Sequence, residues 1–415
     1  MTSTNAEPFA SWGSYDRDDP FPLFASVLDR GPVHPVTLVD GHAAYLIVGY
    51  EAARVALNDP RLSKDMQAAM ERSAEVVAPG LPGPDFARHM LAVDPPDHTR
   101  LRKLVIGAFT PRRIERLRPR VQVIVDTLLD RVAAAGQDTV VDLVSAFAFP
   151  LPFTVICELL GVAEADRSAL GSGLNTLLLP TTTPDEYARA KVASDIVVTM
   201  LATLVGTKRT APGDDLVSAL IGARDGDERL TEKELLSTIF QLIVAGHDTT
   251  ASLIGNGTVA LLRHPVQAAA LRDDPGRVPA AIEELLRYDA PVPHSTFRYA
   301  VEPVEVAGVT IPEGAQVIIS LAAANRDPAR FSHAGELDLE RDRDQRHLAF
   351  GHGIHFCLGA PLARVEGQVA FTSLLRRFPR LRLAVPVERL HWHHGDGLVL
   401  RGLSELPVIA GPPVP

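Results

Sequence analysis

The sequence has only two cysteines, Cys157 and Cys357, among 415 residues. Two cysteines cannot form the disulfide framework of a small secreted protein, and they are too few for a zinc site made of four thiolates. The pair is also far apart in the sequence, so the chain has no CxxC redox motif. The scarcity of cysteine therefore favours a protein of the reducing cytoplasm.

The sequence also lacks the run of about 20 consecutive apolar residues that a bilayer-spanning helix needs. Its first residues, MTSTNAEPFASWGSYDRDDPF, carry acidic groups, so we expect neither a secretory signal nor a membrane anchor. No repeat or long Gly/Ser linker marks a boundary, which favours one domain over residues 1–415. The formal net charge of -10 argues against general binding to nucleic acid.

Amphipathic helix is the main pattern that is present, for example over residues 120–134, 185–206 and 360–377. Two segments predict strand hairpins. One covers residues 36–48 and turns at Asp40-Gly41, and the other covers residues 304–319 and turns at Pro312-Glu313-Gly314. The sequence therefore predicts a mainly α protein with small β-sheets.

A long central helix is predicted to begin after Thr231, which forms a capping box with Glu234. No proline follows until Pro265, so an unbroken helix would be about 50 Å long. Its middle, residues 245–250 (AGHDTT), holds poor helix formers, an acid and two hydroxyls. These residues leave two alternatives open: a functional interruption of a buried helix, or a polar turn between two ordinary helices.

Cys357 lies in a glycine-rich segment, residues 350–359 (FGHGIHFCLG), just before a predicted helix that begins at Ala360. Free N–H groups and the dipole at a helix N-terminus favour a thiolate, and the glycines allow a flat or bulky group to approach. The residues alone indicate a thiolate nucleophile or a metal ligand.

This segment resembles the haem-binding loop of the cytochrome P-450 family, which has the form FxxGxHxCxG in soluble bacterial members. Phe350, Gly353, His355, Cys357 and Gly359 occupy every fixed position of that motif. With this composition, a chance match anywhere in the chain has a probability on the order of 10⁻⁵. The sequence is therefore identified as a member of this family of haem-thiolate monooxygenases.

Other segments match the family in the expected order. Glu284 and Arg287 form its ExxR motif, residues 245–249 match its (A/G)Gx(D/E)T stretch, and residues 324–328 match its ANRDP segment. The resemblance implies the cytochrome P-450 fold, with haem b held between the long central helix and the cysteine-loop helix. It also implies a supply of electrons from NAD(P)H by way of redox partners.

The resemblance also implies roles for the residues around the cofactor. Cys357 would be the axial ligand of the haem iron, whose thiolate donates electron density and favours O–O cleavage. The HxxxR pair of His98 and Arg102, together with Arg298 and His355, would bind the haem propionates. Each of these four, taken alone, could equally be a surface charge or a core histidine.

Asp248 and Thr249 are implied to form the proton relay for oxygen activation. We expect the neighbouring His247 to point to a different helix face and to have a packing or pocket role. Cys157 lies in an apolar helical segment, where a free cysteine is usually a small buried hydrophobe, so we give it no function.

One departure from the family concerns the arginine that completes a triad with Glu284 and Arg287. An alignment without gaps places Glu336 at that position. Either a neighbour such as Arg330 or Arg341 substitutes, or the ExxR pair is held differently.

A strongly basic segment interrupts this acidic chain. Residues 100–120 contain eight basic residues and one acid, a net charge of +7, so the rest of the chain carries -17. The resemblance implies that this segment lies near the cysteine ligand, where a ferredoxin, served by a ferredoxin reductase, would dock. The alternative is a solvated helix face. We expect a monomer with a small-molecule substrate and no nucleic-acid or membrane partner.

The segments that the resemblance places around the pocket are mostly apolar or small, which favours a bulky, mostly apolar substrate. The proposed pocket residues are Leu91, Leu178, Val244, Ala245, His294 and Thr296. The resemblance is strongest to members that hydroxylate or epoxidise macrolides and polyketides in secondary metabolism, such as antibiotic biosynthesis. A steroid or terpene hydroxylase is the nearest alternative. A peroxide-using haem enzyme would not need the relay or the basic segment, and a non-catalytic haem carrier or sensor would not need the pocket.

Overall fold

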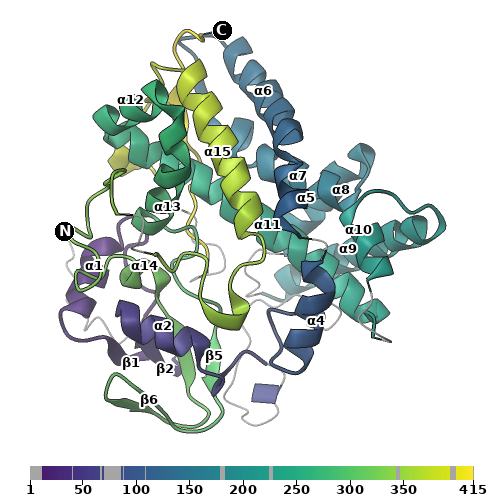
Figure 1. The fold of residues 1–415 in the computed structure, drawn as a ribbon, viewed down its shortest axis with the longest axis vertical. Helices are drawn as coiled ribbons and strands as arrows, with labels where there is room; N and C mark the ends of the chain where they lie inside the picture. The colour runs from purple at the N-terminus through teal and green to yellow at the C-terminus, as the bar shows by residue number, and fades with distance from the viewer. Residues whose placement is uncertain are drawn as a thin grey trace.

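The computed structural model describes residues 12–39, 41–65, 68–69, 86, 88–107, 109–177, 183–223, 228–342, 346–392 and 399–414. Helices make up most of the described chain, and the largest sheet lies at the lower left of the molecule (Figure 1). The central helix α11 and the cysteine-loop helix α15 pack against each other within the helical body (Figure 1). The predicted class, mainly α with small sheets, is confirmed.

The α-helices are α1 (Phe21–Leu28), α2 (Tyr50–Asn58), α4 (Asp97–Ile106), α5 (Pro111–Glu115), α6 (Arg118–Ala134), α7 (Pro150–Leu160), α8 (Glu164–Leu177), α9 (Pro184–Thr210), α10 (Leu216–Gly222), α11 (Glu232–Arg263), α12 (Pro265–Asp273), α13 (Val278–Tyr288), α14 (Leu321–Ala324) and α15 (Ala360–Arg377). Shorter turns of helix are η1 (Val144–Ala148), η2 (Pro275–Arg277), η3 (Gly353–His355) and η4 (Val387–Arg389). The three helices predicted from periodicity correspond to α6, α9 and α15.

The largest sheet has five strands in the order β1-β2-β8-β5-β3. Its strands are β1 (Val33–Thr37), β2 (Ala43–Ile47), β3 (Leu62–Ser63), β5 (Arg298–Ala300) and β8 (Gln316–Ile319). A three-stranded sheet contains β4 (Val140–Asp142), β10 (Pro407–Ile409) and β9 (Arg382–Leu383), and a hairpin contains β6 (Val304–Val306) and β7 (Val309–Ile311). The pair β2–β8 is parallel, and its neighbours in the large sheet are antiparallel.

The two predicted hairpins have different outcomes. β1 and β2 pair antiparallel across the predicted turn, which confirms the first. The second prediction is right about the turn at Pro312-Glu313-Gly314, where the Ala315 N–H donates to Pro312 O at 3.2 Å, but wrong about the pairing. The hairpin forms between β6 and β7, across Ala307 and Gly308, and β8 leaves to join the large sheet. Ala307 and Gly308 have positive φ, +50° and +81°, which gives the tight reversal between β6 and β7.

The central helix α11 is continuous through residues 245–250, which decides between the two alternatives for this segment. Its capping box forms as predicted, with Thr231 and Glu234 bonding each other's backbone. At 32 residues it is about 48 Å long. The helix therefore carries the polar AGHDTT stretch into the interior of the protein.

Helix α9 is the one described helix whose length and apolar composition would suffice to cross a membrane. Its most apolar window has a mean hydropathy of 1.4, and 22% of that window is buried. The helix packs against α8, α10 and α11 in the fold. The sequence analysis predicted no such segment, because the apolar residues of α9 are interrupted by charged and hydroxyl side chains and form no consecutive run.

Candidate active site

Cys357 lies between the turn η3 and the first residue of α15, and glycines shape the backbone on its N-terminal side. Gly351 and Gly353 have φ values of +71° and +74°, a region that residues with a Cβ rarely adopt. A Cβ on Gly353 would lie 2.6 Å from the Asn58 side chain, so this loop packs tightly against the end of α2. The Cys357 N–H donates to Phe350 O at 2.9 Å, which closes the loop.

Two opposing effects act on the Cys357 thiol. Burial raises its pKa above the ordinary value, and hydrogen bonds from the N–H groups of Gly359 and Ala360 lower it. Arg102 and Arg364 also lower it through their charges, but burial prevails. The polypeptide alone therefore does not favour the thiolate that the helix N-terminus led us to expect. A coordinated metal ion would supply that stabilisation, because it removes the thiol proton outright.

The middle of α11 provides a second wall for the site. Most of this helix is buried, but Ala245 is exposed and Val244, Asp248 and Thr249 are partly exposed. The Thr249 hydroxyl donates to Ala245 O at 2.9 Å. Accessible surface in the middle of a buried helix indicates an internal cavity along Val244 to Thr249.

Four basic side chains surround His355, and we call the five residues together the inner basic cluster. All of the other four act on the charge state of His355. Its members are Lys64, His98, Arg102, Arg298 and His355. Burial and these four neighbours lower the pKa of His355 to about 2. Basic groups that lower one another's pKa at one site indicate that the site takes an anionic ligand.

Two members of the inner basic cluster have buried polar atoms without a partner. Neither ring nitrogen of His98 has a hydrogen-bond partner of ordinary geometry, and the same holds for Arg298 Nε. Arg298 donates only to backbone carbonyls of Leu62 and Leu57, at 3.2 and 3.3 Å. Burial lowers its pKa to about 10, with Asp94 opposing. Orphaned donors beside unpaired charge fit the propionates of haem.

Lys64 is the member of this cluster that the sequence analysis missed. It is 6% exposed, and its ammonium donates to the Thr296 hydroxyl. Burial, followed by the charge of Arg298, lowers its pKa well below the ordinary value, and Asp94 opposes them. No sequence signal marks this residue, because Lys64 follows the short strand β3 and meets Arg298 only through the pairing of β3 with β5.

The ExxR pair forms a buried network with a third residue. Arg287 makes two bonds to Glu284, at 2.7 and 2.8 Å, and Arg341 Nε lies 3.1 Å from the same carboxylate. Arg341 therefore completes the triad, as one of the substitutes considered above. Glu336 contributes its backbone carbonyl to Arg287 at 2.8 Å, and its side chain is 75% exposed.

The structure corrects the expectation for His247. Its Nε2 atom lies 3.1 Å from Asp248 Oδ1, although adjacent residues on a helix were expected to face apart. Its Nδ1 atom lies 2.7 Å from Ile243 O. The side chain is 1% exposed, so the pair brings a buried imidazole into contact with the predicted relay acid.

A second buried acid lies behind the relay. Glu366 on α15 is 1% exposed and neither carboxylate oxygen has a hydrogen-bond partner of ordinary geometry. Burial raises its pKa to about 8, and the nearby Thr250 hydroxyl opposes this. Glu366 is therefore neutral at pH 7, and sequence reasoning could not single it out among the acids of an amphipathic helix.

The predicted pocket residues have different surroundings. Leu91 is partly buried, and Leu178 lies outside the described residues. The His294 ring packs against Trp12 and Phe24, with centroids 5.8 Å apart in both pairs, so its contacts are with the N-terminal aromatic residues. Thr296 is held by Lys64 in the inner basic cluster.

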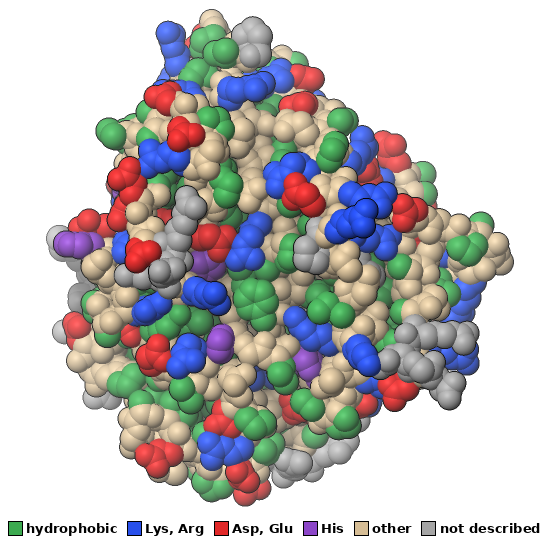
Figure 2. Space-filling view, in the orientation of Figure 1, with side chains coloured by type: hydrophobic (Ala, Val, Ile, Leu, Met, Phe, Trp, Pro, Cys, Tyr) green, Lys and Arg blue, Asp and Glu red, His purple; other side chains and the backbone are tan. Residues whose placement is uncertain are grey.

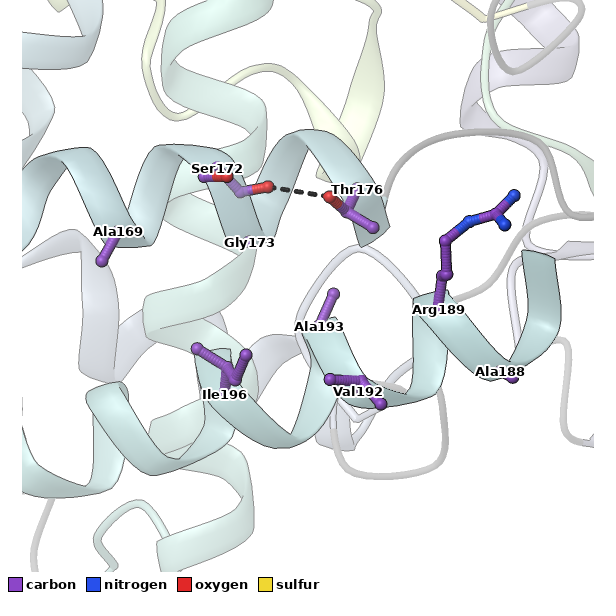
Figure 3. Close-up of a pocket in the computed structure, with 9 residues that line it drawn as sticks. All are labelled: Ala169, Ser172, Gly173, Thr176, Ala188, Arg189, Val192, Ala193 and Ile196. Carbon is purple, nitrogen blue, oxygen red and sulfur yellow. Dashed lines mark hydrogen bonds between the residues drawn. The ribbon is translucent and has the colours of Figure 1, made fainter. Parts of the chain in front are cut away.

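An open groove lies between α8 and α9 (Figure 3). Its volume is about 570 Å³, and its lining is mostly small and apolar, with Arg189 at one end (Figure 3). None of the proposed catalytic or cofactor-binding residues lines it. The groove is therefore separate from the site around Cys357.

The remaining cysteine, Cys157, is fully buried in α7. Burial raises the pKa of its thiol to about 11, so it stays protonated. This agrees with the packing role predicted for it.

Comparison with known proteins identifies the family. The family model described as cytochrome P450 matches residues 174–384, about half of the chain. Cytochrome P450 107B1 of Saccharopolyspora erythraea is 49% identical over 385 residues, which cover 92% of each chain. The 6-deoxyerythronolide B hydroxylase of the same organism is 45% identical over 397 residues, covering 94% of this chain and 96% of that relative.

A solved structure agrees in fold as well as in sequence. The tirandamycin C-bound P450 monooxygenase TamI is 44% identical, with a TM-score of 0.84, and the match covers 95% of this chain and 98% of that one. The cysteine at the start of α15 and the orphaned donors of the inner basic cluster fit the iron and the propionates of haem. The chain therefore belongs to the cytochrome P450 family, as a monooxygenase that holds haem b and takes electrons from NAD(P)H through redox partners.

Proposed function

We propose that this P450 hydroxylates or epoxidises a macrolide or another polyketide of secondary metabolism. The observation that carries the proposal is its similarity, over nearly the whole chain, to an enzyme named for 6-deoxyerythronolide B and to one bound to tirandamycin C. The exposed middle of α11 supports it, because Val244 and Ala245 offer an apolar wall to a bulky substrate.

We also propose that Cys357 is the iron ligand and that the inner basic cluster holds the propionates. Bound haem supplies the chemistry of oxygen activation, with a thiolate ligand favouring O–O cleavage. His98 contacts His355 ring to ring, with centroids 4.4 Å apart, and Arg102 donates to Phe356 O at 2.8 Å. These contacts tie α4 to the cysteine loop, so the ligand and the cluster are positioned together.

Asp248 and Thr249 form the proton relay in this proposal. The Thr249 hydroxyl donates its hydrogen to Ala245 O, so the hydroxyl oxygen can accept a hydrogen bond from a water molecule. The Asp248 side chain is 28% exposed toward the cavity along α11, so it can contact water molecules there and exchange protons with them. Thr249→Ala should release hydrogen peroxide in place of product.

For the redox partner, we propose that a ferredoxin docks beside the cysteine loop over α4 and α5. Several arginines of the basic segment are paired: Arg100 with Glu234, Arg118 with Glu115, and Arg120 with Glu158. Arg112 and Arg116 are exposed and have no ion-pair partner among the described residues. Figure 2 shows blue side chains gathered over α4 and α5 on this face. An acidic protein would meet these two arginines first.

We further propose that residues 1–415 are one P450 domain of the cytoplasm, acting as a monomer. The relatives named above are bacterial, and the match to 6-deoxyerythronolide B hydroxylase extends over 94% of this chain. Size-exclusion chromatography of the purified protein should give a single species close to the mass of 44.7 kDa.

The experiment that tests the substrate class is a spectral titration of the purified ferric protein. Macrolactone and linear polyketide ligands should displace the iron-bound water and shift the Soret band, with turnover giving a product heavier by one oxygen atom. Steroids and terpenes are titrated in parallel. If either class binds more tightly than the polyketides and is turned over, the polyketide proposal is overturned. The reduced protein with carbon monoxide reports thiolate ligation separately, and a non-catalytic carrier would show that spectrum without turning over any ligand.

A further inference from the structure

The contacts of His247 determine where its hydrogens lie. A carbonyl oxygen can only accept, so Nδ1, which lies 2.7 Å from Ile243 O, must carry a hydrogen. An ionised Asp248 carboxylate also only accepts, and its Oδ1 atom lies 3.1 Å from Nε2. A neutral imidazole would place a lone pair against that carboxylate. The geometry therefore requires one more proton on the pair than a neutral histidine and an ionised aspartate would hold.

Among the groups around the His247 ring, Asp248 is the one whose charge affects the protonation of the ring. The η1–α7 region presents two aromatic edges to the ring, Phe149 and Phe153, with centroids 5.4 and 5.6 Å away. The acid on α15, Glu366, interacts with Thr250 on the same stretch of α11. Burial lowers the pKa of His247, but the hydrogen bond and charge of Asp248 outweigh burial and raise it above the ordinary value.

We propose that His247 is a positioning residue, an imidazolium that fixes the Asp248 carboxylate next to Thr249 and stores the proton that the pair passes on. The proposal rests on the Asp248–Thr249 relay proposed above. His247 thereby becomes a third member of the relay, and the resting form of the pair is an imidazolium beside a carboxylate.

The protons of the cycle balance within the pair. At rest the pair is imidazolium and carboxylate, with one transferable proton. Asp248 takes that proton from Nε2 and gives it inward through Thr249 and water, which leaves a neutral imidazole facing a carboxylate. That arrangement is unfavourable, so Asp248, the partly exposed member, takes up a proton that originates in solvent from a water molecule in contact with it and returns it to Nε2. Each cycle moves one proton from solvent to the site and restores the pair.

The chain contains a matched control on the same helix. His264, at the C-cap of α11, makes the same bond to the carbonyl four residues earlier, with Nδ1 2.7 Å from Ala260 O. Its ring packs against Tyr288, with centroids 6.1 Å apart, and it makes no ion pair with a described acid. A change at His264 therefore alters a similar local contact without touching the relay.

The first measurement is the titration of His247 itself, by nitrogen NMR of histidine-labelled holoenzyme in the ferrous carbon-monoxide state. Loss of one signal in His247→Gln assigns the resonance. We expect its midpoint to lie above the ordinary histidine value of about 6.5 and to fall in Asp248→Asn. A midpoint at or below that value, unchanged in Asp248→Asn, would overturn the proposal.

The second measurement is the share of NAD(P)H electrons that ends in product rather than in hydrogen peroxide, as a function of pH. His247→Gln can still donate toward Asp248 but cannot ionise, and His247→Phe keeps a ring without any hydrogen bond. We expect product yield to fall about 3-fold in the glutamine variant and about 10-fold in the phenylalanine variant, a fraction of what a full general acid contributes. His264→Gln should behave as wild type.

The pH dependence separates positioning from mere packing. Wild-type coupling should decline as pH rises through the His247 midpoint, because the imidazolium then loses its stored proton. The glutamine variant should show no such step. Wild-type coupling at every pH in both His247 variants would contradict the role of His247. If Asp248→Asn and Thr249→Ala also remain coupled, the relay itself fails, whereas the NMR titration still decides whether His247 and Asp248 share a proton.

Discussion

Two groups of positive charge in this protein have opposite surroundings. In the inner basic cluster, buried side chains such as Lys64 and Arg298 face one nearby acid, Asp94, and retain donors without partners. In the basic segment of residues 100–120, apart from Arg102, which belongs to the inner basic cluster, four arginines are paired with carboxylates, and Arg112 and Arg116 are exposed to solvent. The comparison shows that a count of charges in sequence does not reveal which charges are available to a ligand. Burial and missing partners do.

The same comparison explains why the cluster needs its cofactor. A buried cation without a counter-charge destabilises a protein, and an anion bound beside it removes that cost. The surface arginines do not destabilise the protein in this way, because water solvates them. Their contribution to stability is small whether or not they are paired. The predictions below are ordered by the size of the effect that each environment should produce.

The largest effect should come from the buried network of Glu284, Arg287 and Arg341, in which the charged groups are paired. Arg341→Ala leaves the Glu284–Arg287 pair with one cation instead of two and removes bonds to three backbone carbonyls. We expect a loss of about 3–5 kcal/mol in the free energy of unfolding. Chemical denaturation measures it. Arg330→Ala is the matched control, and an equal loss there would show that Arg341 is not the triad residue.

Arg298→Leu should weaken the binding of haem. This variant removes a buried cation whose remaining hydrogen bonds go only to backbone carbonyls. We expect haem affinity to fall by about 2–3 kcal/mol, since a charge-assisted contact to a propionate is lost. Transfer of haem to apomyoglobin measures the affinity. A variant that keeps haem as tightly as wild type would remove Arg298 from the propionate site.

Reversing the two unpaired surface arginines should affect the partner and leave haem untouched. In Arg112→Glu with Arg116→Glu, we expect ferredoxin-supported reduction to slow by about 10-fold at low salt, with the difference shrinking as salt is added. Stopped-flow reduction measures the rate. The assignment fails if the reversal and the salt both leave that rate unchanged.

The smallest effect should come from a paired surface arginine. Arg120 makes two bonds of 2.7 Å to Glu158, yet its side chain is 54% exposed. Arg120→Ala should cost about 0.2–1 kcal/mol of stability and leave reduction by ferredoxin near the wild-type rate. A slowing as large as that of the Arg112 and Arg116 reversal would extend the docking surface along α6.

The residues of the site differ in how well sequence could predict them. Cys357 and the capping box of α11 were predictable because each depends on neighbours within a few residues. The second hairpin was not, because the chain turns at both Ala307-Gly308 and Pro312-Glu313-Gly314, and only the tertiary structure decides that β6 pairs with β7 while β8 pairs with β2.

Long-range partners account for the other misses. Arg341 was named from sequence only as an alternative to Arg330, because a gapless alignment places Glu336 at the triad position. The structure selects Arg341, since the intervening loop supplies carbonyls to both arginines. His247 was expected to face away from Asp248, since neighbours on a helix usually do. Its Nδ1–H bond to Ile243 O turns the ring so that Nε2 meets the carboxylate.

The sequence by itself determined the family and the central helix, and it predicted Cys357 as the iron ligand and Asp248 and Thr249 as the relay, because those are local patterns of residue type and spacing. Only the tertiary structure decided which charges are buried, which are paired, and that Lys64 and Glu366 belong around the site. It also decided that His247 meets Asp248 and that Arg341, rather than Arg330, completes the triad. The physical reason is that burial and pairing depend on atoms brought together from distant parts of the chain. A charge acquires its role from those surroundings rather than from its neighbours in sequence.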